Sequence, residues 1–338
     1  MRCGVMAAAM LLVLGITACT AERLPPADVD HAPGSAQTRA AMATSNTLAV
    51  EMPRPEGTEP GYTAYEAART QLLPLLAHGS PRQRLAALLM QPDFSSDGWH
   101  QALVDLLLAD GGRDPLLAGQ ALNACATWKG CPREQVLALT AGLASEDARL
   151  QLLRLALSES AQQESLWEAA VRAPVYVDPF EAQIEALLAA TEPLATSTRQ
   201  DRWRTLEAFA ITAATSGGDL RQLGERCPPA SAVNERVLQC RQLALLFAES
   251  PSVLPAQQGM AVLLRQALPA AEVARWSERY RQLRWQVQLA MPLLDTEPMY
   301  PRYMAEHGER AAIAWLLRQR GLPLNPPSHW QPGQPTGY

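Results

Sequence analysis

Lysine and phenylalanine are scarce in this chain of 338 residues, and positive charge is not in excess. Lys129 is its only lysine, so arginine carries nearly all of the positive charge. Acidic side chains outnumber Lys and Arg by 34 to 29, and the formal net charge is −5. Because no global basic field exists, we do not expect a protein that binds nucleic acid or an anionic lipid surface through its overall charge.

Motifs of the common enzyme classes are also missing. The chain has no Gly-x-Ser-x-Gly elbow, no His-Glu-x-x-His, no glycine-rich phosphate loop and no dinucleotide-binding fingerprint. The five histidines are scattered, as His31, His78, His100, His307 and His329. Without such a motif we predict no catalytic residue, no metal and no cofactor.

One dense polar cluster does occur, at His307-Gly308-Glu309-Arg310. We interpret it as the solvated face of a helix, with a pair between Glu306 and Arg310 four residues apart. The alternative is a paired-carboxylate site made by Glu306 and Glu309, since glycan hydrolysis needs two carboxyl groups across a cleft.

The first twenty residues read MRCGVMAAAMLLVLGITACT, which is one arginine, an apolar run from Val5 to Ile16, and small residues before a cysteine. This is the layout of a secretory signal peptide, and the run falls short of the roughly 20 residues that cross a bilayer. Ile16-Thr17-Ala18-Cys19 resembles the lipobox of bacterial lipoproteins. The resemblance implies cleavage before Cys19, after signal residues 1–18, and a lipid on its thiol. An ordinary signal peptide, cut nearby, is the alternative.

The same resemblance indicates a location. Thr20 follows the cysteine, where an Asp would signal retention in the inner membrane, so sorted lipoproteins of this kind favour the outer membrane with the domain in the periplasm. Residues 19–60 are rich in Ala, Pro, Ser and Thr, and we expect a disordered tether. Residues 61–322 should form the folded domain. Residues 323–338 should form an irregular tail, from which Trp330 can dock back.

Cysteine number and compartment together predict disulfides. Cys3 leaves with the signal peptide, and four cysteines remain in the exported part. Three connectivities are open, and we predict the two local pairs, Cys125 with Cys131 and Cys227 with Cys240. A zinc site of four thiolates is the alternative, but the spacing lacks the tight C-x-x-C pairs that structural zinc prefers.

From residue 61 onward, apolar residues recur at helical spacing with almost no strand-like alternation. We predict an all-α domain built as an array of short helical hairpins. Residues Ser80–Ala173 loosely resemble a degenerate tetratricopeptide-type α-solenoid, and a compact irregular helical domain is the alternative. Long helices are expected over Leu254–Leu268, Ala271–Ala290 and Pro298–Arg320.

The helix expected over Ala271–Ala290 has two apolar faces. One buried stripe consists of Val273, Trp276, Tyr280, Leu283 and Val287. Trp285 and Leu289 fall on the opposite side, and Arg281 lies one turn before Trp285. Since Trp and Arg are enriched at binding hot spots, we predict a partner surface at Arg281, Trp285 and Leu289. The alternative is a helix buried on both faces.

These observations predict a lipid-anchored, periplasm-facing envelope protein that binds a protein or peptide or acts as a scaffold, and that is not an enzyme. Its membrane contact would be the N-terminal lipid. Two alternatives stay open. One is an immunity or inhibitor lipoprotein against a periplasmic toxin, and the other is an enzyme acting on the cell wall or on glycans.

Overall fold

A computed structural model describes residues 62–334 except 92, 94–95, 216–219, 231 and 298. Cys19 and the expected signal peptide and tether lie outside the described residues. Across the described part the chain is helical and has no β-strand, apart from an isolated bridge between Asp147 and Val175. The predicted all-α class is therefore confirmed.

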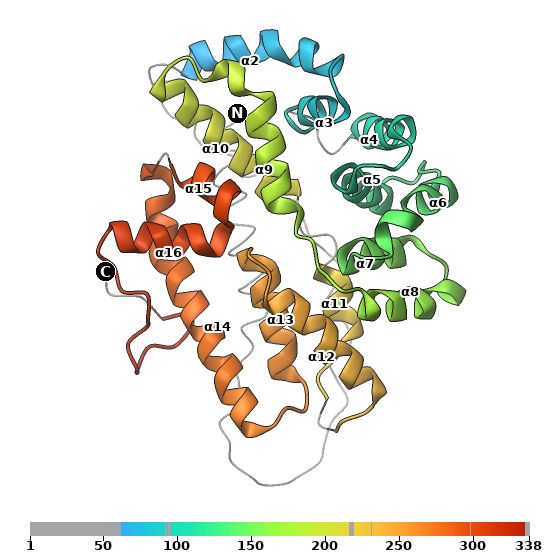
Figure 1. The fold of residues 1–338 in the computed structure, drawn as a ribbon, viewed down its shortest axis with the longest axis vertical. Helices are drawn as coiled ribbons and strands as arrows, with labels where there is room; N and C mark the ends of the chain where they lie inside the picture. Colours follow the sequence, from blue (N-terminus) through green and yellow to red (C-terminus); the bar gives the residue numbers. More distant parts are fainter. Residues whose placement is uncertain are drawn as a thin grey trace, which may run out of the picture. The chain divides into compact units, whose positions relative to one another are not determined.

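The helices follow one another with short connections (Figure 1). The first part contains α2 (Tyr62–Ala77), α3 (Pro81–Leu89), α4 (Asp97–Asp110), α5 (Pro115–Thr127), α6 (Arg133–Ala144), α7 (Ala148–Leu157) and α8 (Ser160–Arg172). The second part contains α9 (Pro179–Ala190), the 3-10 turn η1 (Glu192–Leu194), α10 (Thr198–Thr215), α11 (Leu220–Arg226), α12 (Glu235–Ala248), α13 (Val253–Arg265), α14 (Ala270–Ala290), the 3-10 turn η2 (Met291–Thr296), α15 (Tyr300–His307) and α16 (Glu309–Gln319).

Three helices begin with the same local device, a capping side chain followed by proline. Ser80 precedes α3, Asp114 precedes α5 and Asp178 precedes α9, and each side chain accepts a hydrogen bond from a first-turn backbone N–H. The proline that follows has no N–H to leave unsatisfied, and its φ angle suits a first helical turn. These starts are therefore fixed locally, by two adjacent residues.

Consecutive helices pair as hairpins, most extensively α4 with α5, α7 with α8, and α12 with α13. Helix α9 also contacts α3 and α5, and α10 contacts α2. Figure 1 shows α9 running beside the first hairpins. In a solenoid each repeat touches only its neighbours. Contacts between elements so distant in sequence favour the irregular helical domain over the solenoid.

Both predicted disulfides form. Cys125, in α5, is bonded to Cys131, just before α6, with Cα atoms 5.2 Å apart. Cys227, which follows α11, is bonded to Cys240 in α12, with Cα atoms 5.7 Å apart. Each bond ties a helix to the segment or helix next to it in sequence. The prediction of local pairs is confirmed.

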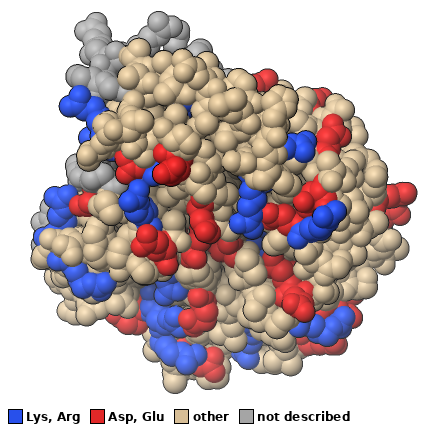
Figure 2. All heavy atoms as spheres, turned by 45° about the horizontal axis from the view of Figure 1, so that its top comes forward, with Lys and Arg blue, Asp and Glu red and all other residues tan. Residues whose placement is uncertain are grey.

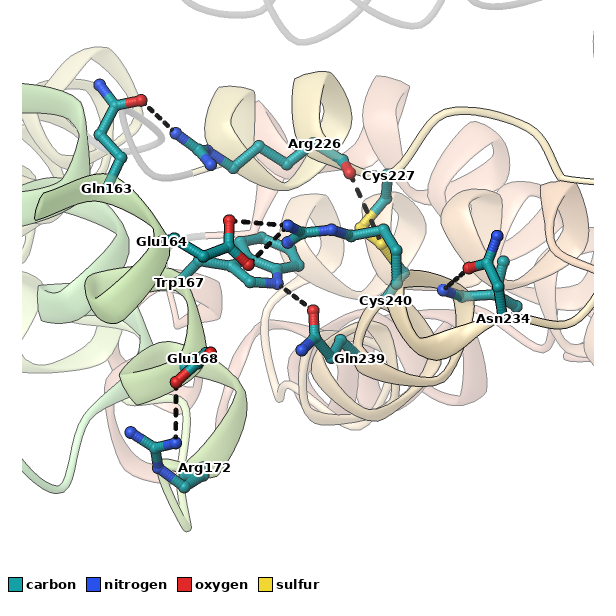
Figure 3. Close-up of polar contacts among 12 residues, drawn as sticks. Gln163, Glu164, Trp167, Glu168, Arg172, Arg226, Cys227, Asn234, Gln239 and Cys240 are labelled. Carbon is teal, nitrogen blue, oxygen red and sulfur yellow. Dashed lines mark hydrogen bonds and ion pairs between the residues drawn. A yellow bond between two sulfur atoms is a disulfide. The ribbon is translucent and has the colours of Figure 1, made fainter. Parts of the chain in front are cut away.

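A polar joint fastens α8 to α12 (Figure 3). Arg236 donates to both carboxylate oxygens of Glu164, at 2.7 and 2.8 Å, and its guanidinium lies over the Trp167 ring at 5.0 Å. The Trp167 indole N–H donates to the Gln239 side chain at 2.8 Å. The Arg236 guanidinium over its ring and the hydrogen bond at its edge thus hold Trp167 of α8 against α12.

The last expected helix is broken. We predicted one helix over Pro298–Arg320, but α15 ends at His307 and α16 begins at Glu309. Gly308 between them has a φ of +87°, which non-glycine residues rarely adopt. A Cβ at this position would lie 2.7 Å from Oε1 of Glu181 and 2.8 Å from Cβ of Pro251. The chain turns here because only glycine fits against α9 and the start of α13.

Candidate functional site

The predicted partner surface on α14 is covered by the protein's own C-terminal tail. Trp285 is 0 % exposed and Leu289 is 4 % exposed. The Trp285 indole N–H donates to the carbonyl of Pro323 at 2.9 Å, and its ring meets that of Trp330 edge-on with centroids 5.2 Å apart. Trp330 itself is 3 % exposed. The docking of Trp330 onto the domain is therefore confirmed.

The tail is held mainly through its backbone. Arg281 donates to the carbonyls of Pro327, at 2.8 Å, and Trp330, at 3.3 Å. Gln286 donates to the carbonyl of Leu324 at 3.0 Å. The prediction of a free partner surface at Arg281, Trp285 and Leu289 is thus wrong. Trp285 and Leu289 are buried on one face, where the proline-rich tail supplies carbonyl acceptors to side chains of α14, and Trp276 and Leu283 are buried on the other. The predicted buried stripe is wrong at Val273, which is 36 % exposed in the first turn of the helix.

A polar pocket of about 410 Å³ opens on another side of α14. It lies where the start of α13, the middle of α14 and the corner between α15 and α16 come together. The lining consists of Pro251, Arg279, Gln282, Leu283, Gln286, His307, Arg310 and Ala311. These side chains are basic, amide or apolar, and the lining contains no carboxylate. The pocket is therefore suited to a ligand that accepts hydrogen bonds.

Two arginines dominate this pocket. Nη1 of Arg310 donates to the carbonyls of Ser250 at 2.9 Å and Ala248 at 3.4 Å, which hold the side chain in place. Arg279 forms a bidentate pair with Glu249, at 2.6 and 2.9 Å, and its guanidinium lies 4.6 Å from the ring centroid of Trp276. Each guanidinium is thereby fixed in direction by a partner outside the pocket.

The positive charges of Arg279 and Arg310 repel each other. Burial lowers the pKa of Arg310, the positive charge of Arg279 lowers it further, and the nearby charge of Glu249 acts in the opposite direction. The hydrogen bonds and charge of Arg279 hold the pKa of Glu249 below its usual range. Glu249 therefore compensates mainly Arg279, and the pocket keeps an excess of positive charge on the side of Arg310.

Behind the pocket wall lies a group of carboxyls. Glu309 accepts the backbone N–H of Val253 at 2.7 Å, at the first residue of α13. Burial raises its pKa to about 7, the Val253 hydrogen bond opposes this shift, and the charges of Asp178 and Glu181 add to it. Oε1 of Glu181 is buried without a hydrogen-bond partner. Asp178 and Glu309 thus cap the starts of α9 and α13.

The predicted pair between Glu306 and Arg310, in the polar cluster around His307, is therefore wrong. Arg310 does not pair with Glu306; it binds carbonyls at the end of α12. Glu306 instead lies 3.8 Å from Nε2 of His307, on an exposed edge. The paired-carboxylate alternative at Glu306 and Glu309 is not formed, because Gly308 separates the two residues into different helices. Neither carboxylate lines the pocket.

A second hollow, of about 660 Å³, lies at the first disulfide. Its lining comprises Lys129, Cys131, Pro132, Arg133, Glu134 and Gln135. All six come from one short segment, so the hollow is a fold of the local surface. The pocket at Arg279 and Arg310 is instead assembled from residues far apart in sequence, and we take it as the candidate site.

Comparison with known protein families, curated proteins and solved structures gives no match to this chain. Within the described residues, no helix is long and apolar enough to cross a membrane. No cluster of His, Cys, Asp or Glu suited to a metal ion occurs there either. The site is accordingly interpreted from its own geometry.

Proposed function

We propose that the protein is a lipid-anchored envelope lipoprotein whose helical domain faces the periplasm and binds a protein or peptide partner. The lipobox-like sequence ending at Cys19 supports the anchor. The two disulfides support an oxidising compartment, because such bonds persist outside the cytosol.

The observation that carries a binding role is the pocket at Arg279 and Arg310. Three separate segments build it, at Pro251, along α14 and at the corner between α15 and α16, and its volume of about 410 Å³ lies in the range of ligand sites. Its arginine and glutamine side chains donate hydrogen bonds, and its lining contains no carboxylate. His307, whose side-chain type can transfer protons, lies at its exposed edge beside Glu306. Binding is the chemistry that this arrangement supports best.

Affinity capture tests the binding role. The full-length protein is crosslinked in intact cells, recovered from the envelope fraction, and compared with Arg310→Gln. Arg172→Gln is the matched control, because it removes the same charge from an exposed side chain of α8 that does not line the pocket. A specific partner should be recovered with the unmodified protein and the control, and lost with Arg310→Gln. Equal recovery in all three would contradict binding at this pocket.

Cell fractionation tests the anchor separately. Cys19→Ala should abolish labelling by a fatty-acid probe and release the protein from the membrane fraction, since the thiol would carry the lipid. Substitution of the other signal-region cysteine, Cys3→Ala, should leave both unchanged. Membrane retention of the Cys19 variant would show that the anchor is something else.

A further inference from the structure

We infer that the pocket binds a carboxylate group of the partner, held between the guanidinium groups of Arg279 and Arg310. This inference rests on the proposed function and names the chemistry that the site recognises. Three features of the pocket lead to it: unused donors, uncompensated positive charge, and an internal example of the same pairing.

Three side chains of the lining, Arg310, Gln282 and Gln286, keep donors that the protein does not use. Nη1 of Arg310 serves the carbonyls of Ser250 and Ala248, but its Nε and Nη2 have no hydrogen-bond partner within the described part of the chain. Gln282 and Gln286 each use one amide hydrogen on the tail, toward Asn325 and Leu324. An amide nitrogen carries two hydrogens, so each retains one. A ligand rich in acceptors would satisfy these groups together.

Charge compensation points to an anion. Arg279 and Arg310 repel each other, while Glu249 is the acidic group that offsets them and it is bound to Arg279. An anion between the two guanidinium groups would remove the repulsion and pair with both. In a partly buried site this gain exceeds that of a surface ion pair, because water screens it less.

Glu249 shows which anion the geometry accepts. Its carboxylate meets Arg279 in a bidentate arrangement, with both oxygens engaged at 2.6 and 2.9 Å. Arg310 presents the same planar fork, with its Nε and Nη2 side unoccupied. A planar carboxylate matches two parallel donors of a guanidinium. A ligand carboxylate would therefore repeat on Arg310 the pairing that Glu249 makes on Arg279.

The positive charge is local to this pocket. Figure 2 shows basic and acidic side chains interspersed over the face in view, without a large area of one sign. The net charge of the chain is −5. Long-range attraction therefore contributes little, and recognition of the carboxylate depends on contact with the arginines.

Calorimetry with small probes tests the ligand class on the mature chain. Succinate should bind, whereas its neutral isostere succinamide should not. Arg310→Gln should weaken succinate binding by at least about tenfold, because one charge-assisted pair is lost, and Arg172→Gln should leave it unchanged. Inorganic phosphate should bind more weakly than succinate.

The opposite results overturn the inference. Equal binding of succinate and succinamide would mean that charge is not recognised. Tighter binding of phosphate would mean that the site is not built for a carboxylate. If Arg310→Gln alters the fold, as judged by circular dichroism, chemical-shift mapping of succinate on the unmodified protein decides the question, and perturbations away from Arg279, Gln282 and Arg310 would refute the site.

Two peptides locate the source of the carboxylate. One is an acetylated trialanine with a free C-terminus, and the other is an amidated peptide with a single internal aspartate. Binding of either supports the inference and assigns the source; binding of neither refutes a peptide carboxylate. The outcomes separate from those of affinity capture. If a partner is captured but succinate does not bind, the carboxylate inference is refuted and the proposed binding function stands. If succinate binds but no partner is captured, the carboxylate site stands and the proposed partner-binding function is refuted.

Discussion

Glu309 is the residue whose environment departs furthest from what its neighbours in sequence indicate. It follows a chain-reversing glycine, and its carboxyl points inward to the first N–H of α13. Sequence periodicity places it on a solvated face, and only the tertiary packing of α9 and α13 against α16 desolvates it. No property of the residues around position 309 could have shown this, because the groups that surround it come from positions 178, 181 and 253.

Its raised pKa gives stability a defined pH dependence. The folded-state pKa is about 7 against an ordinary 4.5, so the carboxyl stays protonated to a higher pH in the folded state than in the unfolded state. Stability should fall as pH rises from about 4.5 to 7 and then level off, by about 1–3 kcal/mol in total. Glu309→Gln, which can still accept the Val253 N–H, should lose this component. Urea unfolding at pH 5 and pH 8 measures it.

The control for that measurement is Glu306→Gln, which removes an exposed carboxyl three positions earlier, in α15. It should keep the pH dependence of the unmodified protein. Identical pH profiles for the Glu309 and Glu306 variants would show that Glu309 is solvated when the protein is folded.

Trp285 allows a second prediction at the same scale. Its ring is fully buried under the tail, so Trp285→Ala should destabilise the fold by about 3–5 kcal/mol, as truncation of core aromatics does. Leu75→Ala is the matched surface change, because Leu75 is 70 % exposed and should cost less than about 0.5 kcal/mol. Chemical denaturation compares the two. A small effect of Trp285→Ala would mean that the tail leaves this face in solution.

At the scale of elements, the sequence specifies helices well and their breaks less well. Ser80, Asp114 and Asp178 each combine a capping side chain with a following proline, and a helix begins at each of these pairs. Gly308 has no such local signal. It resembles any glycine inside a helical pattern, and the lack of room for a Cβ beside it is set by Glu181 and Pro251 from other parts of the chain. Likewise, Arg279 and Arg310 are 31 positions apart, so their pocket could not be read from spacing.

Two glycine substitutions test the corner between α15 and α16. Gly308→Ala should destabilise the protein by more than about 1 kcal/mol, because alanine at positive φ is strained and its Cβ has no room. Gly142→Ala lies inside α6, with no atom within 4 Å of the added Cβ, and should stabilise by about 0.5–1 kcal/mol. Thermal unfolding should show a lower melting temperature for Gly308→Ala and a higher one for Gly142→Ala. Stabilisation by Gly308→Ala would contradict the assigned turn.

For the whole molecule, the tail acts as an internal ligand of α14. Its contacts combine one aromatic anchor, Trp330, with backbone carbonyls that accept from Arg281, Trp285 and Gln286. Apart from the bond between Gln282 and the Asn325 side chain, these polar contacts are independent of the tail's side chains, so sequence alone could not reveal them. The anchor was visible as a tryptophan in a segment with little else to bury.

Truncation of the tail should therefore expose an apolar face that the rest of the domain cannot cover. A chain ending at Gly321 should melt at a temperature several degrees lower and bind a hydrophobic dye, because Trp285 loses its contacts with Pro323 and Trp330. A chain ending at Gln334 should match the full-length protein. A synthetic peptide of residues 322–334, added in excess, should restore the melting temperature of the short chain, since ligands of the native state stabilise it. The same peptide with alanine in place of Trp330 should not. If the chain ending at Gly321 melts like the full-length protein, the tail contributes nothing to stability and the two-faced burial of α14 is wrong.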